Sequence, residues 1–140
     1  MAKILVVDDE ESDRVIIGKM LASDGHEPVY ARNGREAIDI LDRVSGLEAV
    51  ITDLHMPLLN GLKLIRARRA GGDSIPIIAI SGVDAAQLSV AQDQGASATL
   101  TKPVDRIQLL EAVRSALDAE TADEEGVWIS YHPKGRRRAT

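Results

Sequence analysis

Five polar residues of the sequence have the chemistry that phosphoryl transfer needs. Asp8, Asp9 and Asp53 are carboxylates, Ser81 is a hydroxyl donor and Lys102 is a cation. Carboxylates that lie close together raise one another's pKa, and a divalent cation relieves that repulsion. Oxygen ligands without Cys or His favour Mg²⁺, and a cation beside a carboxylate prepares it to attack phosphorus. Lysine and serine then donate to phosphoryl oxygens, so the set predicts phosphoryl transfer at a magnesium site.

These five residues follow four of five short apolar segments in the chain. The segments are Ile4–Val7, Pro28–Ala31, Ala49–Thr52, Ile77–Ile80 and Ala98–Thr101. Continuous apolar runs of this length are typical of strands buried on both faces of a sheet. Taken alone, Asp8-Asp9 would suit the N-terminus of any helix, and Lys102-Pro103 would suit a helix start. The prediction therefore rests on the coincidence of these residue types at four strand ends.

Segments with helical spacing separate the expected strands. The apolar residues expected to face the core from the first and last helices are Val15, Ile16, Met20 and Leu21, and Ile107, Leu110, Val113 and Leu117. Asn33 and Asn60 stand where N-caps of the second and third helices are expected, and Asp84 opens the fourth. Gly25 and Gly95 are expected to end helices.

This alternation predicts an α/β fold with a doubly wound, five-stranded parallel sheet and helices on both faces. Ligands of such sheets bind at the carboxyl ends of the strands, which is where the five polar residues lie. Five repeats are too few for an eight-fold barrel.

Composition narrows the function classes. The 140 residues carry 17 basic and 22 acidic side chains, which argues against a general nucleic-acid binder. There is no Cys, so a disulfide framework and a thiolate nucleophile are excluded. The longest stretch without charge is about half of a membrane span, and we expect no membrane span and a cytoplasmic protein. Helical patterning stops near residue 118, so residues 119–140 are interpreted as a tail with an acidic linker, a possible short strand and a basic end.

The sequence over residues 1–118 resembles the receiver domain of two-component response regulators. The motifs that carry the resemblance are Asp8-Asp9, Asp53-Leu54-His55-Met56-Pro57, Asn60-Gly61, Ser81-Gly82 and Lys102-Pro103. Met56-Pro57 followed by Gly61 predicts a turn that proline rigidifies and that only glycine tolerates easily. The resemblance implies the strand order 2-1-3-4-5.

The resemblance also implies a role for each matching residue. Asp53 would be the phosphoacceptor, and Asp8 or Asp9 with Asp53 and the main-chain carbonyl of His55 would bind Mg²⁺. Ser81 would be the switch hydroxyl, and Lys102 would pair with the phosphate. The donor would be a histidine kinase or a histidine phosphotransfer protein. The chain would then be a regulator rather than an enzyme, catalysing only its own phosphoryl transfer and slow dephosphorylation.

Three positions modify this expectation. Thr99 occupies the place where receivers usually carry an aromatic residue that follows the switch hydroxyl. His55 and Val83 occupy the positions that set how long the phosphate lasts in the family. The usual readout by helix four, strand five and helix five is therefore in question.

We expect a single-domain regulator of the chemotaxis or phosphorelay type, without a DNA-binding domain. Its phosphorylated state would be read by contact with an unknown downstream protein, and a homodimer is compatible with this class. A docking adaptor that never needs phosphate is the alternative function. A flavodoxin-like cofactor binder is disfavoured because Asp8–Glu11 would repel a phosphate in the absence of metal. A haloacid-dehalogenase-type phosphatase would expect a second acid two residues after the first, where this chain has Glu10, but also a cap region that the chain lacks.

Overall fold

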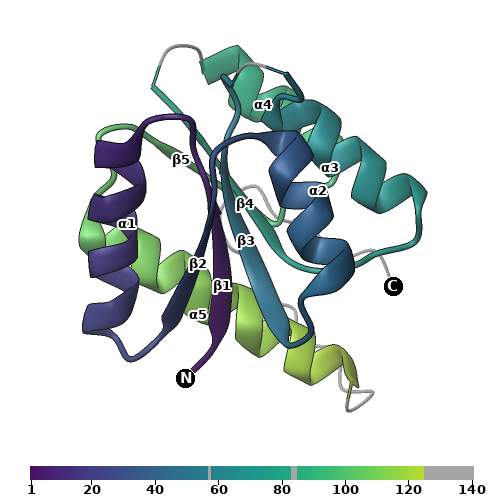
Figure 1. The fold of residues 1–140 in the computed structure, drawn as a ribbon. Helices are drawn as coiled ribbons and strands as arrows, with labels where there is room; N and C mark the ends of the chain where they lie inside the picture. Colours follow the sequence, from purple (N-terminus) through teal and green to yellow (C-terminus); the bar gives the residue numbers. More distant parts are fainter. Residues whose placement is uncertain (57, 83–84, 125–140) are drawn as a thin grey trace.

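The computed structural model describes residues 1–56, 58–82 and 85–124, and it has a five-stranded parallel sheet at its centre (Figure 1). The strands are β1 (Lys3–Val7), β2 (Glu27–Ala31), β3 (Leu47–Asp53), β4 (Ile77–Ser81) and β5 (Ala98–Thr101). Their order is β2-β1-β3-β4-β5, and every neighbouring pair is parallel. The predicted doubly wound α/β fold and the order 2-1-3-4-5 are confirmed.

Helices cover both faces of the sheet, as Figure 1 shows. They are α1 (Glu11–Ser23), α2 (Gly34–Arg43), α3 (Gly61–Ala70), α4 (Ala85–Asp93) and α5 (Arg106–Glu124). The core is divided by the sheet: Ile4 and Val6 of β1 pack with residues of α1 and α5, whereas Leu5 and Val7 pack with residues of α2, α3 and α4. Successive side chains of a strand point to opposite faces, so a strand buried on both faces is apolar throughout.

The predicted helix caps are present where the structure describes them. Asn33 Oδ1 accepts from the backbone N–H of Glu36 (2.8 Å), and Asn60 Oδ1 accepts from that of Lys63 (3.0 Å). Gly25 has φ +83° just after α1, a backbone conformation in which other residues are strained. Asp84 lies outside the described residues, so its predicted cap stays a prediction.

The buried faces of the first and last helices match the prediction in part, since Met20, Leu21, Leu110, Val113 and Leu117 lie in or against the core. In α1, Ile17 and Leu21 are buried, whereas Val15 and Ile16 are 41% and 50% exposed. In α5, Leu109, Leu110 and Val113 belong to the core, whereas Ile107 is 62% exposed. Both helices carry apolar residues that the fold leaves exposed, so the pattern alone left their rotation against the sheet undetermined.

The last helix is longer than predicted. α5 runs to Glu124, so residues 119–124 are helical rather than a linker. The possible strand and the basic end, within residues 125–140, lie outside the described residues, and the domain boundary at residue 118 stays a prediction. Among the described residues, no helix is long and apolar enough to cross a membrane.

Candidate functional site

The predicted site residues gather at the carboxyl edge of the sheet. Asp8 follows β1, Asp53 ends β3, Ser81 ends β4 and Lys102 follows β5. Val7 pairs with Thr52 in the register of β1 and β3, which places Asp8 and Asp53 at the ends of neighbouring strands. The topology therefore brings together residues that are up to 94 positions apart in sequence.

Three carboxylates form a group that fits a divalent cation. One oxygen each of Asp8, Asp9 and Asp53 lies within 4.8 Å of the others. Asp8 and Asp53 are buried, at 1% and 7% exposure, whereas Asp9 is exposed. An all-oxygen donor set of carboxylates, open to solvent on one side, suits Mg²⁺, which keeps several waters.

The buried carboxylate of Asp8 has an altered protonation equilibrium. Loss of solvent, together with the nearby charge of Asp53, raises the pKa of Asp8 to about 6. The backbone N–H of Glu10 opposes this change by donating to Asp8 Oδ1 (3.0 Å). Burial therefore has the largest effect on this pKa, and the neighbouring Asp53 adds to it, because both disfavour the charged carboxylate.

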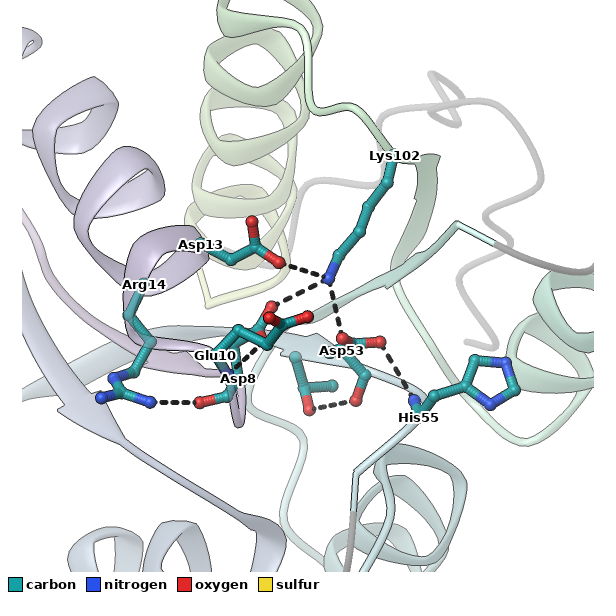
Figure 2. Close-up of polar contacts among 8 residues, drawn as sticks. Asp8, Glu10, Asp13, Arg14, Asp53, His55 and Lys102 are labelled. Carbon is teal, nitrogen blue, oxygen red and sulfur yellow. Dashed lines mark hydrogen bonds and ion pairs between the residues drawn. The ribbon is translucent and has the colours of Figure 1, made fainter.

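Lys102 supplies that ammonium and contacts three carboxylates at once (Figure 2). Its Nζ donates to Asp53 Oδ2 (2.8 Å), Asp13 Oδ2 (2.9 Å) and Asp8 Oδ2 (3.1 Å). Desolvation lowers the pKa of Lys102, but the hydrogen bonds to Asp53 and Asp13 outweigh this effect and hold the pKa above its usual value. The lysine therefore stays charged and faces the oxygens of Asp53.

Sequence reasoning missed Asp13 and Arg14, both in the first turns of α1. Asp13 binds Lys102, and Arg14 Nη1 donates to the main-chain carbonyl of Asp8 (2.8 Å). Acids in a first helical turn are common because the helix dipole favours them, so Asp13 carried no special signal. The available signal was its position: a helix that starts three residues after Asp8 points its first turn over the same sheet edge.

The loop after β3 fixes the Asp53 carboxylate. Asp53 Oδ1 accepts from the backbone N–H of His55 (3.0 Å), and the Thr52 hydroxyl donates to the Asp53 carbonyl (2.9 Å). The His55 side chain is exposed, and its ring points away from the carboxylates in Figure 2. One oxygen of Asp53 thus holds a backbone donor while the other faces Lys102.

Gly61 matters for space, not for the turn that the sequence suggested. Its φ is not in the left-handed region, but a Cβ there would collide with the Asp53 carbonyl oxygen and lie 2.9 Å from Leu54 Cα. Among the described residues of this loop, Leu58 has a positive φ, at 67°. The predicted role of Gly61 is therefore corrected: it lets the start of α3 lie against the backbone of Asp53.

Ser81 and Lys102 are joined by a backbone hydrogen bond at the ends of β4 and β5. The backbone N–H of Lys102 donates to the Ser81 carbonyl (3.0 Å), and Ser81 is buried. A Cβ on Gly82 would lie 3.2 Å from Lys102 Cβ, so glycine leaves room for the lysine stem. Lys102-Pro103 does not start a helix, because α5 begins at Arg106 and Asp105 Oδ2 accepts from the N–H of Gln108 (2.9 Å).

Two of the three positions at which the sequence modifies the expected signalling, Thr99 and Val83, add little to the description of the site. Thr99 lies half-buried in β5, paired with Ala79 of β4. Val83 lies outside the described residues.

Comparisons with known proteins agree with this geometry. A family model described as the response regulator receiver domain matches residues 4–114. Response regulator MprA of Mycolicibacterium vanbaalenii is 37% identical over 125 residues, which are 87% of this chain and 53% of that protein. MprA of Mycobacterium leprae is 33% identical over 92% of this chain and 58% of that protein. The chain thus spans about half the length of the curated relatives it matches.

Solved structures share the fold and the extent of the domain. A receiver domain protein from Clostridium thermocellum has a TM-score of 0.81 and 30% identity, covering 86% of this chain and 98% of that one. A response regulator receiver protein from Pseudomonas putida has a TM-score of 0.76 and 35% identity, covering 81% and 96%. The chemotaxis protein CheY4 of Vibrio cholerae has a TM-score of 0.75 and 28% identity, covering 84% and 99%. The chain therefore belongs to the response regulator receiver domain family.

Proposed function

We propose that the chain is a phosphoacceptor switch in which Asp53 takes a phosphoryl group from a phosphohistidine donor. The observation that carries the proposal is the 2.8 Å contact of Lys102 Nζ with Asp53 Oδ2 beside a carboxylate group that fits Mg²⁺. A histidine kinase or a histidine phosphotransfer protein in the cytoplasm would be the donor.

The transfer forms one bond and breaks one. An oxygen of Asp53 attacks the phosphorus atom, the P–N bond of phosphohistidine breaks, and its electron pair stays on the imidazole nitrogen. The product on this chain is an acyl phosphate. Lys102 is placed to donate to a phosphoryl oxygen, and Ser81 supplies a hydroxyl from the end of the next strand.

Asp8, Asp9, Asp53 and the main-chain carbonyl of His55 are the proposed Mg²⁺ ligands. When bound, the ion supplies positive charge that offsets the charge of the phosphoryl oxygens. The chain's own contribution is to hold Asp8 and Asp53 in place: the N–H groups of Glu10 and His55 fix one oxygen of each.

A partner would recognise the phosphorylated state through the change in charge at the carboxyl edge of the sheet. A phosphoryl group adds negative charge, and a conformational equilibrium shifts only as far as that charge stabilises one state over the other. The phosphorylated state would be recognised by a downstream protein or by a second copy of the chain. His55 and Val83 are the proposed determinants of slow hydrolysis of the acyl phosphate.

Thr99 favours a second candidate, a docking adaptor that works without phosphate. A threonine cannot reproduce the large rotamer change of an aromatic side chain, so this route from Ser81 to the outer face of β5 is weakened. A partner that binds the phosphorylated chain, the unphosphorylated chain and Asp53→Asn with the same affinity would favour this candidate.

Intact-mass measurement tests the phosphoacceptor role. The chain is incubated with a small acyl phosphate, with Mg²⁺ or with EDTA, alongside Asp53→Asn and the exposed-carboxylate control Asp118→Asn. One phosphoryl adduct should form with Mg²⁺ on the wild type and on the control, and none on Asp53→Asn. An equal adduct on Asp53→Asn would refute the proposal, as would a folded wild type that accepts phosphate neither from this donor nor from a phosphorylated histidine kinase.

A further inference from the structure

Asp13 is a fourth carboxylate at the site, and it stands apart from the other three. It lies on α1, and its Oδ2 accepts from Lys102 Nζ (2.9 Å). Within the described part of the chain, the carboxylates close enough to share a metal ion are Asp8, Asp9 and Asp53, without Asp13. Among the described residues its side chain pairs with the lysine, and it is one-third exposed.

Lys102 has no spare donor in this arrangement. An ammonium carries three N–H groups, and those of Lys102 face Asp8, Asp13 and Asp53 at 3.1, 2.9 and 2.8 Å. Phosphorylation of Asp53 releases one of these N–H groups, so Lys102 can donate a second hydrogen bond to the phosphoryl group only when Asp8 or Asp13 gives up its own.

Phosphorylation of Asp53 would affect the three carboxylates that Lys102 contacts in different ways. Asp53 becomes an acyl phosphate and loses its negative charge at the carboxyl group. Asp8 is buried and belongs to the group that fits a cation. Asp13 lies on α1, outside the group that fits a cation, and is not consumed by the transfer, so it remains as the carboxylate that competes with the phosphoryl group for the lysine.

We propose that Asp13 is a positioning residue. It competes with the phosphoryl group for the ammonium of Lys102 and thereby lowers the affinity of the site for the phosphoryl group. This inference rests on the proposed phosphoacceptor function. The Asp13–Lys102 ion pair also lines a cavity of about 370 Å³, together with Ile16, Ile17, Pro103 and Val104. Asp53 does not line this cavity, so solvent that enters it can hydrate Asp13 when Lys102 leaves it.

The expected effects of Asp13→Asn follow from this competition. An amide oxygen holds the ammonium less tightly than a carboxylate, so Lys102 is freed for the phosphoryl group. Affinity for beryllofluoride, which mimics the phosphoryl group on an aspartate, should rise about three- to tenfold at saturating Mg²⁺. Asp13→Glu keeps the charge and should stay near the wild-type affinity.

A double-mutant cycle distinguishes competition for Lys102 from a general charge effect. Beryllofluoride binding is measured by ¹⁹F NMR for the wild type, Asp13→Asn, Lys102→Ala and the double variant. Glu11→Gln is the matched control, because Glu11 is exposed in the same helical turn and has no bond to Lys102 among the described contacts. The inference predicts tighter binding in Asp13→Asn, no change in Glu11→Gln, and no effect of Asp13→Asn once Lys102 is removed.

Each other outcome has a distinct meaning. Unchanged or weaker binding in Asp13→Asn overturns the inference while leaving the phosphoacceptor role intact. So does the same gain in the Lys102→Ala background, which would reveal a long-range charge effect. Failure of the wild type to bind beryllofluoride at any Mg²⁺ concentration would overturn the proposed function and this inference together.

Discussion

Lys102 Nζ and Asp53 Oδ2 lie 2.8 Å apart, although 49 residues separate them in sequence. The contact joins the ends of β3 and β5, which are not neighbours in the sheet, across the end of β4. It places a permanent positive charge beside the oxygen that the proposed chemistry uses.

Removing that charge should have opposite effects on the affinity for Mg²⁺ and on the rate of phosphoryl transfer. In Lys102→Met, Asp8 and Asp53 lose their ammonium partner, so Mg²⁺ meets no competing cation and its affinity should rise. Phosphoryl transfer should slow by at least about tenfold, because the lysine no longer stabilises the phosphoryl oxygens. Calorimetry and intact-mass time courses measure the two effects, with the exposed Lys63→Met as control. Parallel losses of metal binding and transfer would contradict this account.

Gly61→Ala should damage the site through its backbone. The new Cβ collides with the Asp53 carbonyl and Leu54, so α3 or the Asp53 loop must shift, at a cost of about 1–3 kcal/mol in the free energy of unfolding. Phosphoryl uptake should fall as well. Gly71→Ala is the control, since its Cβ would meet nothing closer than 3.5 Å. Urea denaturation compares the two variants, and equal stability would contradict the close packing seen here.

The raised pKa of Asp8 predicts that the stability of the metal-free protein depends on pH. Its pKa is about 6 in the folded state against 3.8 for an unperturbed group, so the folded chain holds a proton that the unfolded chain has released. The contribution of Asp8 to the free energy of unfolding should therefore fall as pH rises from about 4 to 6, by up to about 3 kcal/mol.

This contribution is the difference between wild type and Asp8→Asn, measured by urea denaturation in EDTA. The subtraction removes the acids whose pKa is lowered, such as Glu36 and Asp73, because both proteins contain them. A difference that grows with pH would mean that Asp8 is stabilised as the anion, against this account.

Mg²⁺ should stabilise the folded chain. A ligand that binds only the folded state at one hundred times its Kd adds about 2.7 kcal/mol to the free energy of unfolding. The gain should disappear in Asp53→Asn and remain in Asp118→Asn, as thermal unfolding with and without the metal will show. Stabilisation that survives in Asp53→Asn would place the ion elsewhere.

The sequence was most informative about residues whose environment is decided locally. Buried strands such as Ile77–Ile80 are apolar throughout, and Asn33 and Asn60 cap helices within their own turn, so a pattern suffices to predict them. The strand order came from resemblance, because an apolar strand does not specify its neighbours.

Features that depend on tertiary contact were missed. Asp13 contacts Lys102 because α1 packs near the end of β5, and Gly61 is explained by the backbone of Asp53 rather than by its own φ. The exposure of Ile16 and Ile107 reflects how α1 and α5 are rotated against the sheet. Local patterning does not encode such distances between elements.

Chemical mapping of the phosphoryl group tests the central claim most directly. An acyl phosphate on aspartate is reduced by borohydride to homoserine, which peptide mass spectrometry locates in the chain. After incubation with an acyl phosphate and Mg²⁺, this account predicts homoserine at position 53 and at no other aspartate. Homoserine at position 8, 9 or 13, or a stable phosphoryl group that borohydride leaves unreduced, would contradict it.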